Sequence, residues 1–274
     1  MERGGRLLVF ASMNDILERP QTHSDKAASV DSPQLETSSL KDRRIAITGG
    51  TTGIGRATAH LLAEQGAKLF VIGRDQQALD DAIREGPGDI KGMSADLATN
   101  GGVDTFFRRA SETLGGLDVA ILNAAVAAEA LTTMSIEDIR YSIDVNFAAV
   151  VVGARAAAER MTSGDIVIVG STSSHDLSPQ STVYAGAKAG LSGFAEALRR
   201  ELGPKGIRVT LIEPGLTASD LHFPDKCPPE QRKLVGEDKM LKAEDIAAAI
   251  HFALTQPRRA VVQSISVVPL NNAE

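Results

Sequence analysis

Seven short apolar runs recur along the chain, and longer stretches with helical character separate each run from the next. The runs span residues 44–48, 68–72, 90–94, 118–122, 165–169, 208–212 and 264–268. Most of them are apolar throughout, which is typical of strands buried on both faces of a parallel sheet. The regular rotation of strand and helix predicts an α/β fold, namely a single doubly wound domain with a seven-stranded parallel sheet. In such sheets a ligand binds beyond the carboxyl ends of the strands.

The first part of the chain departs from this pattern. Residues 12–42 are rich in Ser, Thr, Asp, Gln and Pro and show no apolar period. We therefore predict a mobile N-terminal arm over residues 1–42 and a single folded domain over residues 43–274. A wrongly assigned start codon would also place residues without an apolar period before the folded domain, and Met13 is a possible later start. The apolar run before Asp15 is short and lacks a small-x-small cleavage site, so we expect no signal peptide.

The composition excludes several classes of protein. The 274 residues carry a formal net charge of −6, whereas a protein that binds nucleic acid needs a basic face. The single cysteine, Cys227, excludes an internal disulfide and favours a reducing compartment, which we take to be the cytoplasm. No apolar run approaches the roughly 18–20 residues that span a bilayer, so we expect no membrane association. The five histidines have no metal-ligand spacing, and no metal site is predicted.

A glycine-rich turn follows the first predicted strand and opens a helix, in RIAITGGTTGIGRATA (44–59). Gly49, Gly53 and Gly55 let the backbone turn tightly and approach a pyrophosphate, at which the helix from about Ile54 points its amide groups. The literal dinucleotide fingerprint is imperfect, because Thr58 stands where its third glycine or alanine would be. A glycine turn without a ligand is the alternative, but its place in an α/β domain favours a nucleotide.

Tyr184 and Lys188 stand four residues apart in VYAGAKAG (183–190), on one face of a predicted helix. They could form an inert surface pair, or the ammonium could lower the pKa of the phenol. An ammonium about 4 Å from a phenolate is worth roughly 4 kcal/mol at an effective dielectric constant of 20. That energy lowers the usual pKa of about 10 by about 3 units, before the cost of burial is subtracted. We therefore expect a pKa near neutrality, which suits an acid–base catalyst.

Further motifs stand in order between residues 44 and 220. They are SADL with Asp96, LNAAV with Asn123 and Ala124, IDVNF with Asn146, Ser171 thirteen residues before Tyr184, and EPGLTASD with Pro214 and Gly215. With the turn T-G-x-x-x-G-I-G (48–55) and the Tyr-x-x-x-Lys pair, they resemble the short-chain dehydrogenase/reductase family. Two positions depart from the family's N-N-A-G segment, where Leu122 replaces an asparagine and Ala125 a glycine.

The resemblance implies a Rossmann-like fold, with residues 43–274 as the catalytic domain of an oxidoreductase that interconverts a small carbonyl compound and its alcohol. Tyr184 would be the general acid or base, and Lys188 would lower its pKa and hold the nicotinamide ribose. Ser171 would hydrogen-bond the substrate oxygen, and Asn146 would hold a water next to Lys188. The implied cofactor-binding residues are Gly49, Thr51, Thr52, Gly53, Ile54, Gly55, Arg74, Asp96, Leu97, Asn123, Ala124, Tyr184, Lys188, Pro214, Gly215, Thr217 and Ser219.

The end of the second predicted strand indicates which nicotinamide cofactor is used. Enzymes that use NAD usually place an acid there to bind the ribose 2′-hydroxyl, whereas an arginine suits a 2′-phosphate. Gly73 occupies the position of the acid, and Arg74 follows it. We interpret Arg74 as the phosphate ligand and Asp75 as the N-cap of the next helix, which predicts NADP(H).

The substrate and the assembly are less constrained. The segment 217–240 corresponds to the family's lid, and its short length favours a small substrate; the pocket candidates are Gln180, Val183, Leu221 and Phe223. The C-terminal part resembles NADP-dependent 3-hydroxy acid or serine dehydrogenases. The helix 146–161 and the face with Ala185, Ala189 and Leu198 are unusually apolar, and the family uses these helices between subunits, so we expect a homodimer or homotetramer.

Three other functions fit the sequence less well. A serine hydrolase with Ser171, His175 and Asp176 lacks the G-x-S-x-G elbow. A non-catalytic NADP(H)-sensing or binding protein on the same fold typically loses the tyrosine or the lysine, and this chain keeps both. An epimerase or dehydratase of the longer related branch is disfavoured by the glycine spacing and the length.

Overall fold

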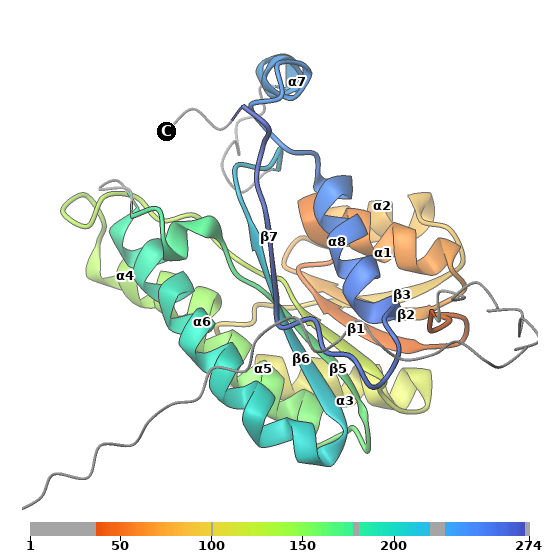
Figure 1. The fold of residues 1–274 in the computed structure, drawn as a ribbon. Helices are drawn as coiled ribbons and strands as arrows, with labels where there is room; N and C mark the ends of the chain where they lie inside the picture. The colour runs from red at the N-terminus through yellow and green to blue at the C-terminus, as the bar shows by residue number, and fades with distance from the viewer. Residues whose placement is uncertain (1–36, 100, 178–180, 220–227, 272–274) are drawn as a thin grey trace, which may run out of the picture. The chain divides into compact units, whose positions relative to one another are not determined.

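The computed structural model describes residues 37–99, 101–177, 181–219 and 228–271, and Figure 1 shows their fold. Seven parallel strands in these residues form one sheet with the order β3-β2-β1-β4-β5-β6-β7. Their bounds are β1 (Arg44–Thr48), β2 (Lys68–Gly73), β3 (Asp89–Ser94), β4 (Val119–Leu122), β5 (Gly164–Val169), β6 (Ile207–Pro214) and β7 (Ser264–Val267). The predicted fold class, a doubly wound α/β domain, is confirmed.

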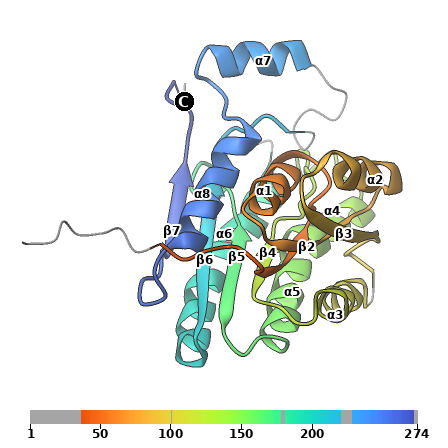
Figure 2. The ribbon, with the colours of Figure 1, turned by 90° about the vertical axis from the view of Figure 1, so that its right-hand side faces the viewer.

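Helices cover both faces of this sheet. They are α1 (Gly53–Glu64), α2 (Gln76–Glu85), α3 (Gly102–Leu114), α4 (Ile136–Ile143), α5 (Ala149–Ala158), α6 (Thr182–Leu202), α7 (Pro228–Gly236) and α8 (Ala243–Thr255), with short turns η1 (Asp144–Ala148), η2 (Thr172–Ser174) and η3 (Gly203–Lys205). Figures 1 and 2 show α1 and α8 together on one face and α5 and α6 on the other.

Two apolar cores follow from this arrangement. One lies between the sheet and α3, α5 and α6 and includes Phe106 and Phe107, whose ring centroids are 5.0 Å apart. The other lies between the sheet and α1 and α8 and includes Leu62 and Ile250. Central strands serve both cores, and every residue of β5 is buried. The edge strands β3 and β7 are only partly buried, which explains why their sequences are less uniformly apolar.

The strand order reverses between β1 and β4, which are neighbours in the sheet but lie far apart in the sequence. The chain winds outward from β1 to β3 and then returns to β4 on the other side of β1. The loops after these two strands therefore diverge and leave a crevice at their carboxyl ends, which is where ligands bind in this class of fold.

Part of the predicted arm belongs to the packed unit. Residues 1–36 lie outside the described residues, but Leu40 is buried in the core that α1 and α8 cover. The backbone amide of Ser38 donates a hydrogen bond of 2.7 Å to the carbonyl of Thr255 in α8. Residues 38–42 thus lead into β1 along the edge of this core.

A cluster of charges lies at the amino ends of the strands, opposite the crevice. The buried Asp165 in β5 accepts hydrogen bonds from Arg208 Nε at 2.5 Å, Arg43 Nη2 at 2.8 Å and Arg258 Nη1 at 3.1 Å. Arg208 is also buried, and its guanidinium donates further hydrogen bonds to backbone carbonyls, including that of Ala260. One carboxylate therefore links the start of the sheet to the segment that follows α8.

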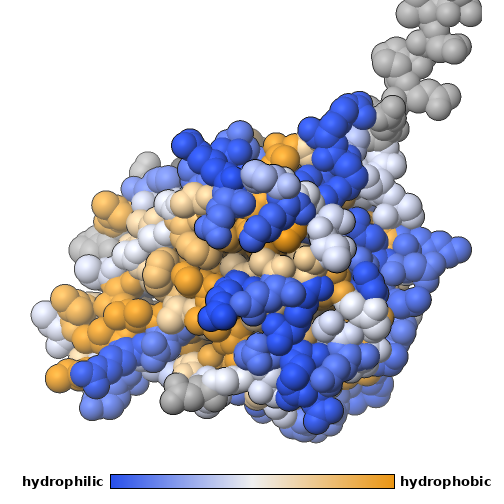
Figure 3. Space-filling view, turned by 90° about the horizontal axis from the view of Figure 1, so that it is seen from below, coloured by the Kyte–Doolittle hydropathy of each residue, from blue (hydrophilic) through white to orange (hydrophobic). Residues whose placement is uncertain are grey.

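The helices expected between subunits are partly covered within the domain. Ala185 and Leu198 are buried, so the domain's own core accounts for that part of the apolar face. Ala189 is exposed, and so are Ile143 and Val152 on α4 and α5. Seen from below, apolar residues gather toward the left of the molecule, the side on which α4, α5 and α6 lie in Figure 1 (Figure 3).

Among the described helices, none combines the length and apolar character that crossing a bilayer requires.

Candidate active site

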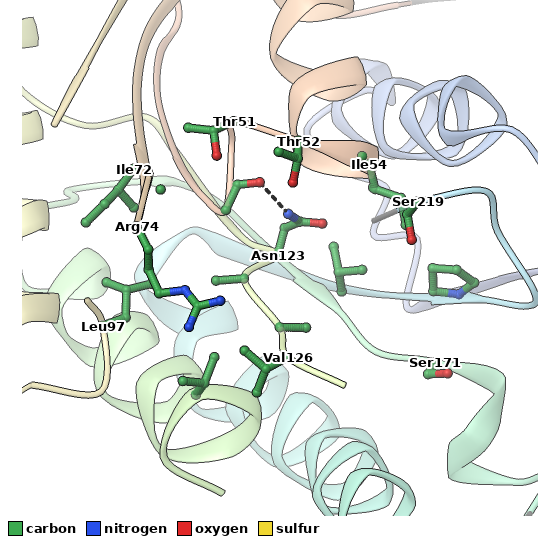
Figure 4. Close-up of a pocket in the computed structure, with 18 of the residues that line it drawn as sticks. Thr51, Thr52, Ile54, Ile72, Arg74, Leu97, Asn123, Val126, Ser171 and Ser219 are labelled. Carbon is green, nitrogen blue, oxygen red and sulfur yellow. Dashed lines mark hydrogen bonds between the residues drawn. The ribbon is translucent and has the colours of Figure 1, made fainter. Parts of the chain in front are cut away.

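A cavity of about 300 Å³ opens at the carboxyl ends of the strands, at the point where the strand order reverses. Most of the predicted site residues line it: Gly49, Thr51, Thr52, Gly53, Ile54, Arg74, Asp96, Leu97, Asn123, Ala124, Ser171, Tyr184, Lys188, Pro214, Gly215, Thr217 and Ser219. In Figure 4, Arg74 and Ser171 lie at opposite ends of this cavity. Two predicted residues, Gly55 and Asn146, do not line it.

The glycine turn after β1 has the geometry of a cradle for an anion. Gly49 and Gly53 have positive φ angles of 65° and 48°, which side chains other than glycine rarely adopt. A Cβ on Gly55 would lie 1.9 Å from the carbonyl oxygen of Gly49, so Gly55 allows α1 to pack against the turn. Thr52 is the N-cap residue of α1, but its side chain makes no capping hydrogen bond. The first amide groups of α1 therefore remain available to a phosphate.

Asn123 stabilises this turn from the end of β4. Its Nδ2 donates hydrogen bonds to the carbonyls of Thr48 at 3.1 Å and Gly49 at 3.0 Å. The backbone amides of Asn123 and Ala124 in turn donate to the hydroxyl of Thr48. The asparagine predicted to bind the cofactor thus also holds the β1 turn against β4.

Tyr184 and Ser171 meet at the other end of the cavity. Both residues are buried, and their hydroxyl groups are hydrogen-bonded to each other. Burial raises the pKa of Tyr184 to about 12, and the hydrogen bond with Ser171 offsets only part of this rise. The expected pKa near neutrality is therefore not found, because the cost of removing a phenolate from water is the larger effect. At neutral pH the phenol is protonated and can act as a proton donor.

Lys188 is the cation of the pair, and it is 1% exposed. Its Nζ lies 5.4 Å from the centroid of the Tyr184 ring and donates a hydrogen bond of 2.9 Å to the carbonyl of Val169, the last residue of β5. Burial lowers the pKa of Lys188 to about 8. The i, i+4 spacing correctly placed the two side chains together, but it did not reveal this backbone partner.

We expect Lys188→Met to stabilise the protein in the absence of cofactor. A pKa lowered from 10.5 to about 8 corresponds to a cost on the order of 3 kcal/mol for keeping the buried ammonium charged. Loss of the hydrogen bond to Val169 offsets about 1 kcal/mol of this gain. Thermal unfolding at pH 7 should therefore show a rise in Tm of roughly 4–8 °C, given about 2–4 °C per kcal/mol.

The pH dependence provides the check on this prediction. The pKa of Lys188 is lower in the folded protein than in the unfolded chain. The cost of burying its charge is therefore fully present below pH 8 and disappears as the pH rises from about 8 to 10.5. The advantage of Lys188→Met should shrink over the same range. Lys91→Met, at an exposed position on β3, is the matched control and should change Tm little at any pH. Equal Tm values for Lys188→Met and the wild type at pH 7 would contradict the assignment of a buried, charged lysine.

Asn146 lies behind the cavity, in the π-helical turn η1 between α4 and α5. Its Nδ2 donates to the carbonyl of Val126 and to Ser142 Oγ, and its Oδ1 accepts from the amide of Val126. The side chain therefore fixes the segment after β4, of which Val126 lines the cavity. π-helical turns are often found at functional sites. The predicted role in holding a water next to Lys188 stays a prediction.

Glu213 is a buried carboxylate that was not among the predicted site residues. An acid within the apolar run of β6 could have indicated it, because a glutamate is rarely buried without a partner. Its Oε1 accepts a hydrogen bond from Ser174 Oγ at 2.9 Å and lies 3.1 Å from His175 Nε2. Ser174 Oγ also lies 2.8 Å from the carbonyl oxygen of Ser171. Glu213 thus secures the turn that carries Ser171, and His175 pairs with this carboxylate instead of forming a hydrolase triad.

Arg74 follows β2 and reaches over the cavity, between Leu97 and Val126 (Figure 4). As predicted, Asp75 is the N-cap of α2, and its carboxylate accepts a hydrogen bond of 2.6 Å from the amide of Ala78. At Gly73 an added Cβ would lie 2.3 Å from Thr51 Oγ1, so a larger residue at this position would force Thr51 to move.

The predicted pocket residues for the substrate are mostly outside the described part of the chain. Gln180, Leu221 and Phe223 belong to the segments 178–180 and 220–227, and Val183 is half-buried at the start of α6 without lining the cavity. Within the described residues, no group of three or more His, Cys, Asp or Glu side chains is placed to hold a metal ion.

The residues around the cavity fit a nicotinamide dinucleotide. The uncapped amides of α1 face the cavity beside the two positive-φ glycines and suit a pyrophosphate. A guanidinium stands at one end, and a serine, a tyrosine and a lysine converge at the other. These three features suit the phosphates and the reacting end of a dinucleotide, whereas a glycine turn without a ligand would need none of them.

Comparison with known proteins agrees with this geometry. The family model described as short chain dehydrogenase matches residues 43–226. An uncharacterized oxidoreductase of Staphylococcus aureus (strain USA300) is 32% identical over 236 residues, which cover 84% of this chain and 99% of that protein. The crystal structure of a short chain dehydrogenase from Burkholderia cenocepacia in complex with NADP has a TM-score of 0.74, with 30% identity over 84% of this chain and 98% of that chain.

A dehydrogenase/reductase from Sinorhizobium meliloti is similar in structure, with a TM-score of 0.74 and 28% identity over 86% of this chain and 98% of that chain. The family model thus covers the β1 turn, the Tyr184–Lys188 pair and the strands β1 to β6. The chain belongs to the short-chain dehydrogenase/reductase family and is an oxidoreductase that acts on small molecules.

Proposed function

We propose that this protein is an NADP(H)-dependent oxidoreductase that interconverts a small carbonyl compound and its alcohol. The observation that carries the proposal is the meeting of Ser171, Tyr184 and Lys188 in the same cavity as the glycine cradle of β1. The bound nicotinamide would supply or accept the hydride. We further propose that the protein acts as a homodimer or homotetramer, which is supported by the exposed apolar residues of α4 and α5.

The roles of the side chains follow from their positions. In the reducing direction Tyr184 donates its phenolic proton to the carbonyl oxygen, which suits its raised pKa. Ser171 donates a hydrogen bond to the same oxygen and stabilises the charge that develops there. Lys188 provides a cation 5.4 Å from the centroid of the Tyr184 ring, which would stabilise the phenolate until a proton returns from solvent. In the oxidising direction the same groups act in reverse.

Arg74 supports the choice of NADP(H). It is the first charged side chain after β2 and lines the cavity, while Asp75 is engaged as the N-cap of α2. The Burkholderia cenocepacia relative binds NADP in its crystal structure. A guanidinium suits a 2′-phosphate because it offers several fixed N–H donors and a permanent charge.

Paired titrations of the purified protein with NADPH and NADH, followed by fluorescence, test the proposal. We expect NADPH to bind at least tenfold tighter than NADH. We expect Arg74→Ala to weaken NADPH binding by about 10–100-fold, because a hydrogen-bonded charge pair is worth about 1.5–3 kcal/mol. The same variant should leave NADH binding almost unchanged.

Arg84→Ala is the matched control, since Arg84 is an exposed arginine on α2 that pairs with Asp81 outside the cavity. It should not alter the affinity for either cofactor. Equal or tighter binding of NADH by the wild type would mean that the ribose is held by another group, with Asp75 as the first candidate. A failure to bind either cofactor would point to the departure at Ala125 and would remove the basis for the enzyme assignment.

A further inference from the structure

Tyr141, the other of the two tyrosines in the chain, links two residues of the cofactor cavity. Arg74 Nη1 donates a hydrogen bond of 2.6 Å to the Tyr141 hydroxyl, which in turn donates one of 3.2 Å to Asp96 Oδ2. The guanidinium carbon of Arg74 also lies 5.7 Å from the centroid of the Tyr141 ring. Nothing in the mechanism above uses this tyrosine.

The three residues come from three separate elements. Arg74 follows β2, Asp96 follows β3, and Tyr141 lies in α4. Arg74 and Asp96 line the cavity, whereas Tyr141 does not. Tyr141 therefore stands behind two cavity residues and contacts both of them without facing the cavity itself.

A phenol is well suited to this position. It is neutral, accepts from the guanidinium and donates to the carboxylate, so it can hold both charges with one atom. Burial is the main cause that raises the pKa of Tyr141, which keeps its proton on the oxygen at neutral pH. The contact occupies one of the five N–H donors of Arg74 and leaves the others for a ligand. It also restricts a long, exposed side chain that would otherwise sample many rotamers.

We propose that Tyr141 is a positioning residue for NADP(H): its hydroxyl holds the guanidinium of Arg74 at the adenosine end of the cavity and thereby strengthens the preference for the 2′-phosphate. This inference rests on the proposed function. Tyr141 belongs to α4, so the cofactor preference depends on an element other than the β2 loop.

The test is the substitution Tyr141→Phe, which removes the hydroxyl and keeps the ring that lies beside Arg74. Dissociation constants for NADPH and NADH are measured by fluorescence for the wild type, Tyr141→Phe, Arg74→Ala and the double variant. We expect Tyr141→Phe to weaken NADPH binding by about 3–10-fold and to leave NADH binding unchanged. In the Arg74→Ala background the same substitution should have no effect, because there is no guanidinium to position.

Several results would overturn the inference. Equal weakening of both cofactors would mean that Tyr141 supports the cavity generally and not Arg74. Tighter binding of NADPH would mean that the hydroxyl competes with the phosphate for Arg74. Additive effects in the double variant would mean that the two residues act separately. A wild type without any preference for NADPH would overturn the proposed cofactor as well, whereas the other outcomes leave that proposal intact.

Discussion

Tyr184→Phe should lower kcat for carbonyl reduction by about 10²–10⁴-fold, because this range is typical for the loss of a positioned general acid. The substitution removes one oxygen atom from a buried ring and leaves the packing of α6 in place. Binding of NADPH should be retained, since the amides of α1 and Arg74 are untouched. The measurement is the change in absorbance at 340 nm with a panel of small aldehydes, ketones and alcohols, together with a cofactor titration by fluorescence.

The pH profile makes this prediction sharper. A phenol with a pKa of about 12 is protonated at pH 7, which favours the reducing direction. The fraction of phenolate rises about tenfold per pH unit below the pKa, so alcohol oxidation should accelerate from pH 7 toward alkaline pH. Tyr184→Phe should lose this acceleration. Ser171→Ala should retain it with a lower kcat, since Ser171 stabilises charge and does not transfer the proton.

Two results would count against a catalytic Tyr184. If Tyr184→Phe turned over the same substrates within threefold of the wild type, another group would have to supply the proton. If the wild type bound NADPH but reduced no substrate in the panel, the protein would be better described as a cofactor-sensing protein. Unchanged cofactor affinity in the variant excludes the simpler explanation that the substitution disturbed the fold.

The sequence predicted the sheet well because the strands are buried on both faces. A strand such as β1 has no polar face, and its bounds matched the prediction residue for residue. The start of α6, at Thr182, gives a weaker periodic signal than the strands, although the Tyr184–Lys188 pair was expected on a helix. The residues in between are small, and Ala185 and Ala187 are buried without giving a clear amphipathic pattern.

The site residues were predictable where their arrangement depends on spacing within one short segment of the sequence. Tyr184 and Lys188 lie one helical turn apart, and the turn after β1 needs glycine at Gly49 and Gly53 for backbone reasons. Contacts between distant segments were not predictable in this way. Arg74 and Tyr141 are separated by 67 positions, and nothing in either segment indicates the partner. The pKa of Tyr184 was misjudged for the same reason, because burial is a property of the whole fold.

Asp165→Asn should lower the free energy of unfolding by about 3–5 kcal/mol, which is typical when one partner of a buried ion pair is removed. The carboxylate of Asp165 is the anionic partner of Arg208, and both side chains are nearly inaccessible to water. Asparagine has almost the same shape, but it leaves the guanidinium of Arg208 buried without a counter-charge. Arg43 and Arg258 contact the same carboxylate, so like charges would also face one another. Thermal unfolding should show a decrease in Tm of roughly 6–20 °C.

Arg258→Ala is the control for this prediction, because Arg258 contacts the same carboxylate but its side chain is 43% exposed. Exposed ion pairs contribute about 0–1 kcal/mol, so this variant should change Tm by no more than a few degrees. The cluster lies at the amino ends of the strands, and the cofactor cavity lies at their carboxyl ends, so Asp165→Asn should retain the wild-type affinity for NADPH below its own Tm. A loss of less than 1 kcal/mol for Asp165→Asn would mean that the backbone carbonyls around Arg208, such as that of Ala260, satisfy the buried guanidinium without the carboxylate.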